Sequence, residues 1–188
     1  MPCTKRDVFY FTGGVRYMAI TREAFLEILK DSYSAYYNIF PNDNTTELPL
    51  AFRADFYSRD ERYWLTKSIP IWGNETNEFV YVFSAPEFDG PTVERCMDYV
   101  IENSLPRVKP HKEHQYTNFK ALFISDSLND QVRAAIEKRS FTKSYKFSLH
   151  GYSTLMTAAV DLGKTRVTTN KAGNSLVKYF RKLFDVSK

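Results

Sequence analysis

Gly163-Lys164-Thr165 is the tripeptide in this 188-residue chain that comes closest to a catalytic motif. A phosphate-binding loop has the pattern G-x-x-x-x-G-K-[ST], in which the first glycine lets the backbone wrap around the phosphates. Here Ala158 occupies the position of that first glycine. The tripeptide also lies between two strand-like runs, so the pattern predicts a two-residue hairpin turn with glycine first.

Carboxylates paired with a lysine would indicate a metal-dependent nuclease of the restriction-enzyme type. Such a site uses an Asp and an acidic-x-Lys triplet to hold a divalent cation and polarise water, and neither Asp-x-Lys nor Glu-x-Lys occurs in the chain. A degenerate metal-dependent nuclease or other hydrolase, with a site near Glu87, Asp89 and the histidines, is the alternative hypothesis. Asp89 is equally well explained as a partner for the N-terminus of the following helix.

The three histidines do not form a recognisable metal site. His111 and His114 have i, i+3 spacing, but Pro110 and the mixed charges around them predict a loop, and two histidines are too few for zinc. His150 precedes a glycine and is predicted to lie in a turn. Ser153 lacks the second glycine of a G-x-S-x-G elbow. We therefore predict no catalytic residue, no metal site and no cofactor.

The remaining signal is one of binding, and it comes from the distribution of charge. Residues 41–104 carry 5 basic and 12 acidic side chains, whereas residues 164–188 carry 7 basic and 1 acidic. Basic and aromatic residues are the types that contact the phosphates and bases of nucleic acid. The predicted binding residues are Lys146, Lys164, Arg166, Lys171, Lys178, Arg181 and Lys182. A solvated basic face is the alternative left open, because such residues near a helix C-terminus also favour the helix dipole.

Compartment and partners follow from what the composition lacks. Cys3 and Cys96 are too few for a disulfide framework, so we expect free thiols in a reducing environment. No apolar run is long enough for a signal peptide or a membrane span. We predict a soluble, cytoplasmic protein with no membrane contact, which binds nucleic acid or another anionic partner and self-associates through its aromatic surface.

Hydrophobic periodicity predicts an α+β fold: a mixed, mainly antiparallel sheet packed with about four helices in a single domain, residues 1–188. A split into two subdomains near residue 110 is the alternative. The predicted helices span residues 21–40, 91–104, 129–138 and 174–184. The predicted strands span residues 7–12, 15–20, 50–58, 62–68, 79–84, 117–125, 144–149, 152–162 and 165–169. Residues 105–115 are predicted to be a linker.

Part of the sequence resembles an uncharacterised family of small bacterial proteins. The similarity covers residues 114–180, a little over a third of the chain. The segments that carry it are Tyr116-Thr117, Lys143-Ser144-Tyr145-Lys146-Phe147, His150-Gly151-Tyr152, Val160-Asp161-Leu162 and Asn170-Lys171-Ala172-Gly173. This resemblance implies a bacterial, cytosolic protein and no particular activity or site.

Overall fold

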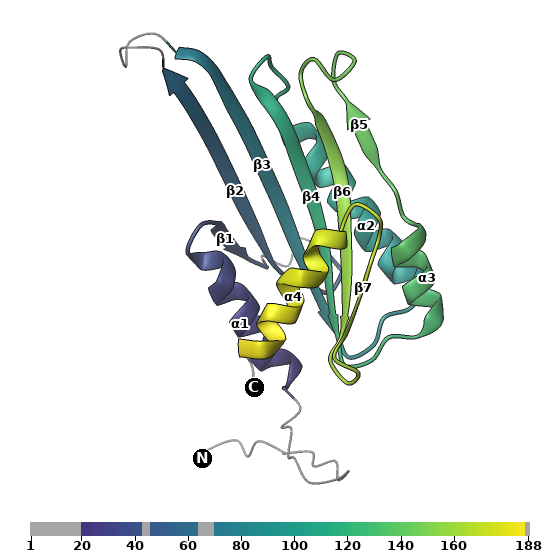
Figure 1. The fold of residues 1–188 in the computed structure, drawn as a ribbon. Coiled ribbons are helices and arrows are strands. Elements are labelled where there is room, and N and C mark those ends of the chain that lie inside the picture. Colours follow the sequence, from purple (N-terminus) through teal and green to yellow (C-terminus); the bar gives the residue numbers. More distant parts are fainter. Residues whose placement is uncertain (1–19, 43–45, 64–69, 187–188) are drawn as a thin grey trace.

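The computed structural model describes residues 20–42, 46–63 and 70–186 (Figure 1). The hairpin predicted for residues 7–20 therefore lies almost entirely outside the described residues. The elements, in chain order, are α1 Arg22–Ser34, β1 Asn38–Pro41, β2 Leu50–Tyr63, β3 Pro70–Ala85, α2 Gly90–Ser104, the 3-10 helix η1 Leu105–Arg107, β4 His114–Ser125, α3 Asp130–Lys138, β5 Thr142–Ser144, β6 Tyr152–Asp161, β7 Arg166–Thr169 and α4 Asn174–Val186.

One sheet joins all the described strands in the order β1-β2-β3-β4-β6-β5, and β7 also pairs with β6. Strands β1 to β3 form an antiparallel meander, β3, β4 and β6 run parallel, and β5 and β7 are antiparallel to β6. The predicted mixed, mainly antiparallel sheet with four helices is confirmed. Residues 105–115, predicted as a linker, instead form η1, a turn and the start of β4.

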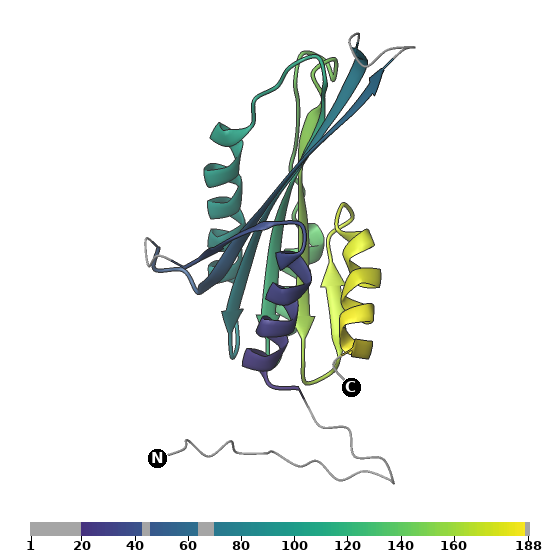
Figure 2. The ribbon, with the colours of Figure 1, turned by 90° about the vertical axis from the view of Figure 1, so that its left-hand side faces the viewer.

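Helices cover the sheet on both faces (Figure 2). On one face, α1 contributes Phe25 and Leu29 and α4 contributes Phe180 to a core cluster with Val82 and Leu122 of the sheet. On the other face, α2 and α3 cover a second cluster that includes the stacked rings of Phe83 and Phe123, 5.4 Å apart. We call these the α1/α4 face and the α2/α3 face.

The first helix begins where its sequence predicts and ends earlier. Thr21 caps α1 by accepting a hydrogen bond from the backbone of Ala24. The predicted continuation to Phe40 is wrong, because the helix ends at Ser34 and residues 38–41 pair with β2 as an edge strand. Tyr36 has helical spacing but is 78% exposed, so the helical pattern past Ser34 does not correspond to a buried stripe.

Two of the predicted strand assignments are also wrong. The turn expected at Arg59-Asp60-Glu61 is absent, since β2 pairs with β3 without interruption from Phe52 to Arg62. Residues 145–149, predicted as part of the strand 144–149, lie in a bend and a turn instead, and the turn predicted at His150 is confirmed. The hairpin at Gly163-Lys164 is confirmed, but its turn spans residues 162–165 and the positive φ falls on Thr165, at 49°.

Candidate ligand-binding face of the sheet

The three parallel strands change character halfway along their length on the α1/α4 face. Where α1 and α4 cover them, their side chains are apolar, as in the row formed in register by Val82, Leu122 and Ala158. Among the described residues, no helix lies over the other halves of β3, β4 and β6 on this face, as both ribbon views show (Figures 1 and 2). We call these halves the uncovered region of the sheet.

Three rows of side chains lead from the edge of the covered core, where Val80, Lys120 and Met156 are buried, into the uncovered region. Strand register and the two-residue alternation of side chains define them. The row nearest the helices is Val80, Lys120 and Met156; the next is Phe56, Glu78, Asn118, Thr154 and Thr142; the outermost is Thr76, Tyr116, Tyr152 and Ser144. We call the polar and tyrosine members of these rows the polar platform.

Glu78 is the centre of the platform's hydrogen bonding. Its carboxylate accepts hydrogen bonds from the Tyr37 hydroxyl and the Lys120 ammonium, and Asn118 Nδ2 lies 3.5 Å from Glu78 Oε1. Burial raises the pKa of Tyr37, and the hydrogen bond to Glu78 raises it further, so this phenol stays protonated and donates. The side chains of Glu78 and Lys120 are largely buried, 18% and 10% exposed, and their ion pair adds no net charge to the platform.

The structure brings together in space part of a motif that is absent from the sequence. Lys120 is the register partner of Val80, two residues after Glu78, so β4 supplies the lysine of an acidic-x-Lys arrangement. The nearest strand carboxylate, Asp55 of β2, is the register partner of Phe79 on the α2/α3 face and pairs with Arg107 there. Among the residues that the structure describes, no group of three His, Cys, Asp or Glu is placed to hold a metal ion.

Two tyrosines give the platform a stacking surface. The rings of Tyr116 and Tyr152 occupy neighbouring positions of the outermost row, with centroids 6.1 Å apart. Tyr152 is 40% exposed. Adjacent, accessible aromatic rings on a sheet are suited to stacking against planar groups such as nucleobases.

The predicted basic residues fall into three groups. Lys178, Arg181 and Lys182 are exposed on α4, which packs on the same face as the platform, and Lys171 lies in the turn before it. Lys146 lies in the β5–β6 connection, beside the platform's edge. Lys164 and Arg166 lie at the opposite end of β6, roughly 30 Å from Lys146 at about 3.3 Å per strand residue. The seven residues therefore do not form one contiguous cluster.

The residues of the hydrolase alternative lie at opposite ends of the sheet. Glu87 and Asp89 follow the C-terminal end of β3, whereas His111 and His114 precede or begin the parallel strand β4. Asp89 caps α2 by accepting a hydrogen bond of 2.7 Å from the backbone of Thr92, as its helix-partner explanation predicts. The two carboxylates and the histidines do not converge on one point.

The histidines and their neighbours form hydrogen bonds within the fold on the α2/α3 face. The His111 ring bonds to Glu75 Oε2 at 2.9 Å. Burial acts to raise the pKa of Glu75, but the hydrogen bonds from Asn77 and His111 outweigh it and leave that pKa below its usual value. The buried His114 ring bonds to the His150 carbonyl at 2.8 Å, which places His150 in the predicted turn. These contacts tie the start of β4 to neighbouring segments.

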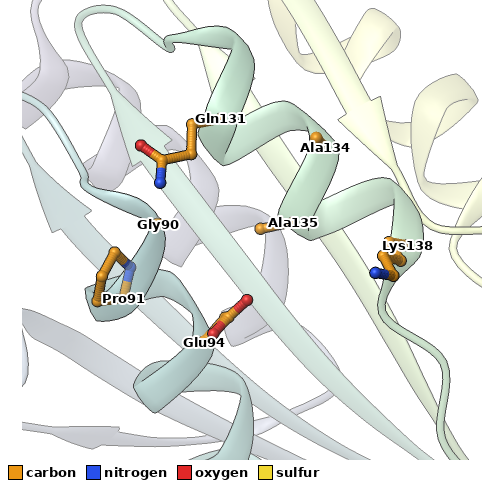
Figure 3. A pocket seen from close by; sticks show the side chains of 7 residues that line it. All are labelled: Gly90, Pro91, Glu94, Gln131, Ala134, Ala135 and Lys138. Atoms are coloured by element: carbon orange, nitrogen blue, oxygen red, sulfur yellow. The ribbon is translucent and has the colours of Figure 1, made fainter.

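A shallow groove of about 260 Å³ lies between α2 and α3 (Figure 3). Its lining residues are Gly90, Pro91, Glu94, Gln131, Ala134, Ala135 and Lys138. The Gln131 side chain lies against Gly90, 3.3 Å from the position a Cβ would take. None of the predicted binding residues lines this groove. Its two charged lining residues, Glu94 and Lys138, come from α2 and α3.

The platform residues match no sequence motif, but the polarity of the parallel strands indicates where they lie. Over the stretch in which they pair with one another, the three parallel strands start polar and end apolar: ETNE before FVYVFSA in β3, HQYTN before FKALFIS in β4, and YST before LMTAAV in β6. A central strand is expected to be apolar on both faces throughout. A polar start shared by three such strands indicates a region of the sheet that no helix covers.

Comparison with known proteins gives one match. Residues 21–182 match the model of a protein family described as "Domain of unknown function (DUF8052)". No curated protein and no solved structure matches the chain. No helix among the described residues is long and apolar enough to cross a membrane.

Proposed function

The chain belongs to the DUF8052 family of domains of unknown function, and from the surface of its sheet we propose that it is a binding module for single-stranded nucleic acid. The observation that carries the proposal is the position of Tyr116 and Tyr152. Their rings lie side by side in the outermost row of the α1/α4 face, in the half that no described helix covers. Single-stranded nucleic acid is bound by such stacking rings together with basic side chains that follow the backbone.

The polar members of the platform support the same ligand class. Asn118 and Thr154 carry the amide and hydroxyl groups that hydrogen-bond to base edges and sugars. Lys120 lies one row deeper, beside Glu78. A ligand lying across the strands would therefore stack on the tyrosines of the outermost row and form hydrogen bonds with Asn118 and Thr154 of the next row.

The basic residues of α4 extend this surface on the same side of the molecule. Lys178, Arg181 and Lys182 are exposed, and the opposite side of their helix packs on the sheet through Phe180. Phosphates leaving the platform towards α4 would meet Lys171 first, in the turn before the helix. Lys164 and Arg166 lie beyond this path and would contact only a longer strand.

Compartment and assembly belong to the same proposal. The protein acts in the cytoplasm of a bacterial cell, which is consistent with the single described cysteine, Cys96, being free. Burial raises the pKa of its thiol to about 12, so the thiol is unreactive. Self-association through exposed aromatic residues such as Tyr57, which is 56% exposed, would leave the platform free because Tyr57 lies on the other face.

Replacing both platform tyrosines tests the proposal. We expect Tyr116→Ala with Tyr152→Ala to weaken binding of a fluorescein-labelled 12-nucleotide single strand by at least about tenfold. Base stacking on an aromatic ring contributes about 1–3 kcal/mol per base, and 1.4 kcal/mol is about tenfold in affinity. The measurement is fluorescence anisotropy on the full chain with DNA and RNA strands and with a duplex of the same sequence.

Tyr36→Ala is the matched control, because Tyr36 is more exposed than either tyrosine and lies outside the three rows. Equal losses in the control and the double variant, or no binding by the wild type at low salt, would end the nucleic-acid proposal. Calorimetric titration with Mn²⁺ addresses the hydrolase alternative: a heat of binding that Glu87→Gln removes would favour it.

The basic surface of α4 makes a separate prediction. Removing Lys178, Arg181 and Lys182 together should reduce the salt dependence of single-strand binding, because each phosphate contact contributes about −0.7 to the slope of log K against log salt concentration. We expect the slope to fall by about 2 if all three contact phosphates. Lys138→Ala, on a helix of the opposite face, should leave the slope unchanged, and an equal change there would contradict the assignment.

A further inference from the structure

The connection between β5 and β6 has an unusual backbone. Lys146, Phe147 and Ser148 have φ values of 47°, 54° and 69°. This left-handed region costs a residue with a side chain roughly 1–2 kcal/mol, and three such residues in succession form a left-handed helical turn. None of them is glycine, so the turn is maintained by the contacts around it.

Backbone hydrogen bonds close the turn on itself. The amide of Tyr145 donates to the carbonyl of Gly151 at 3.0 Å, and the amide of His150 donates to the carbonyl of Tyr145 at 3.1 Å. Within the turn, the amide of Leu149 donates to the carbonyl of Lys146 at 3.1 Å. These bonds fix both ends of the segment and its first residues.

The base of the turn is anchored to the sheet. The Tyr145 hydroxyl and the Ser153 hydroxyl lie 2.9 Å apart, and the His114 ring packs edge-on against Tyr145 with centroids 5.9 Å apart. The His114 ring also bonds to the carbonyl of His150. The turn is therefore attached to β4 and β6 through side chains as well as through the backbone.

This anchored turn holds apolar side chains in water. Phe147 is fully exposed and Leu149 is 76% exposed. Lys146 lies in the same turn, and the Lys143 ammonium lies 5.8 Å from the centre of the Tyr145 ring at its base. A rigid apolar protrusion flanked by lysines has already lost much of the conformational entropy that binding would otherwise cost.

The protrusion is adjacent to the platform along the chain. Ser144, the last member of the outermost row, directly precedes the turn, and Tyr152 of the same row follows it after Gly151. The row that holds Tyr116 and Tyr152 therefore ends at the pair of strands that this turn connects. Apolar side chains such as Phe and Leu insert at base steps or cover the exposed face of a base pair in nucleic-acid complexes.

We propose that Phe147 and Leu149 form a wedge that stacks on the terminal base pair where a duplex gives way to a single strand. The proposal rests on the single-strand function proposed above and assigns it a substrate class: nucleic acid with a junction between single-stranded and double-stranded regions. The unpaired strand lies on the platform, the last base pair contacts Phe147, and Lys146 lies near the adjacent phosphates.

The test compares three labelled ligands with the full chain by anisotropy: a 12-nucleotide single strand, a blunt 12-base-pair duplex, and that duplex carrying the same 12 nucleotides as an overhang. We expect the wild type to bind the overhang ligand more tightly than the single strand by about five- to hundredfold, the range for one stacked base. Phe147→Ala should abolish this preference and change single-strand affinity by less than about twofold, whereas Phe147→Trp should retain the preference.

Each outcome separates the two proposals. If the wild type binds the single strand without preferring the overhang, or if Phe147→Ala weakens all ligands equally, the wedge is overturned and the platform stands. If no ligand binds, the platform itself fails. A lower sedimentation coefficient for Phe147→Ala than for the wild type, with an unchanged ligand preference, would assign the protrusion to contact with a second copy and also overturn the wedge.

Discussion

Asp161→Ala is expected to destabilise the protein by about 3–5 kcal/mol, the usual cost of removing one partner from a buried ion pair. Asp161 is fully buried at the C-terminal end of β6. Its carboxylate accepts a hydrogen bond of 2.9 Å from Arg133 of α3 and another of 2.9 Å from the backbone of Lys164. The alanine variant would leave the Arg133 guanidinium beside an empty space and the turn after β6 without its acceptor.

Asp130→Ala is the matched control, because Asp130 also contacts Arg133, at 3.0 Å, but from a position that is 98% exposed. Surface ion pairs contribute about 0–1 kcal/mol, so this variant should be nearly as stable as the wild type. The measurement is the free energy of unfolding from urea denaturation. Similar values for the two variants would show that Asp161 does not hold α3 and the β6–β7 turn together.

Asp161 also belongs to a set of internal contacts at the carboxyl ends of the parallel strands. In open sheets with parallel strands, ligands usually bind beyond the carboxyl ends of those strands. Here those ends are occupied by internal contacts: Asp161 bonds to Arg133, and Ser125 donates to the carbonyl of Pro86 at 3.0 Å. The accessible polar surface lies instead at the amino ends of the same strands, on the platform.

Signals that act over a few residues predicted structure well. The caps Thr21, Asp89 and Asn129 each accept a hydrogen bond from the backbone three residues later, so the helix starts follow from local sequence. The strand Thr117–Ser125 was predicted from its apolar run, and β4 differs only by starting three residues earlier. Fold class follows from such elements because their order limits the ways in which a sheet can be covered.

Features that depend on distant contacts could not be predicted in the same way. Tyr37, from the connection between α1 and β1, and Glu78 and Lys120, from β3 and β4, are separated by 41 and 42 residues in sequence. The early end of α1 reflects pairing between β1 and β2, which competes with the helical spacing of Tyr36 and Phe40. The platform can therefore be recognised only from the strand register, although the polar stretches of its strands are visible in the sequence.

The left-handed turn is the feature for which local sequence signals gave the most inaccurate prediction. Tyr145-Lys146-Phe147 alternates basic and aromatic residues, which is typical of a strand, and no glycine marks the three positive φ angles. The contacts at the base of the turn come from His114, more than 30 residues earlier. Tertiary contacts therefore decide this conformation, and the only local sign of it is Gly151, directly after the turn.

Gly151→Ala is expected to destabilise the protein by about 2–5 kcal/mol, for two reasons that add. Gly151 has a φ of 73°, which costs alanine about 1–2 kcal/mol. A Cβ would also lie 2.4 Å from the carbonyl oxygen of Gln115 and 2.5 Å from that of His114. These are backbone atoms at the start of β4, which pairs with β3 and β6, so relief requires a shift of the sheet and costs a further 1–3 kcal/mol or so.

Gly90→Ala is the control for this substitution, since Gly90 has no positive φ and its nearest neighbour is the flexible Gln131 side chain, 3.3 Å away. We expect that variant to lose less than about 1 kcal/mol in the same urea experiment, because a long side chain can move aside.

Gly151→Ala should in addition abolish the preference for overhang ligands in the population that remains folded, since the base of the Phe147 turn would shift. If Gly151→Ala is as stable as Gly90→Ala and keeps that preference, the turn is not held against β4 as described, and the rigidity on which the wedge depends is lost with it.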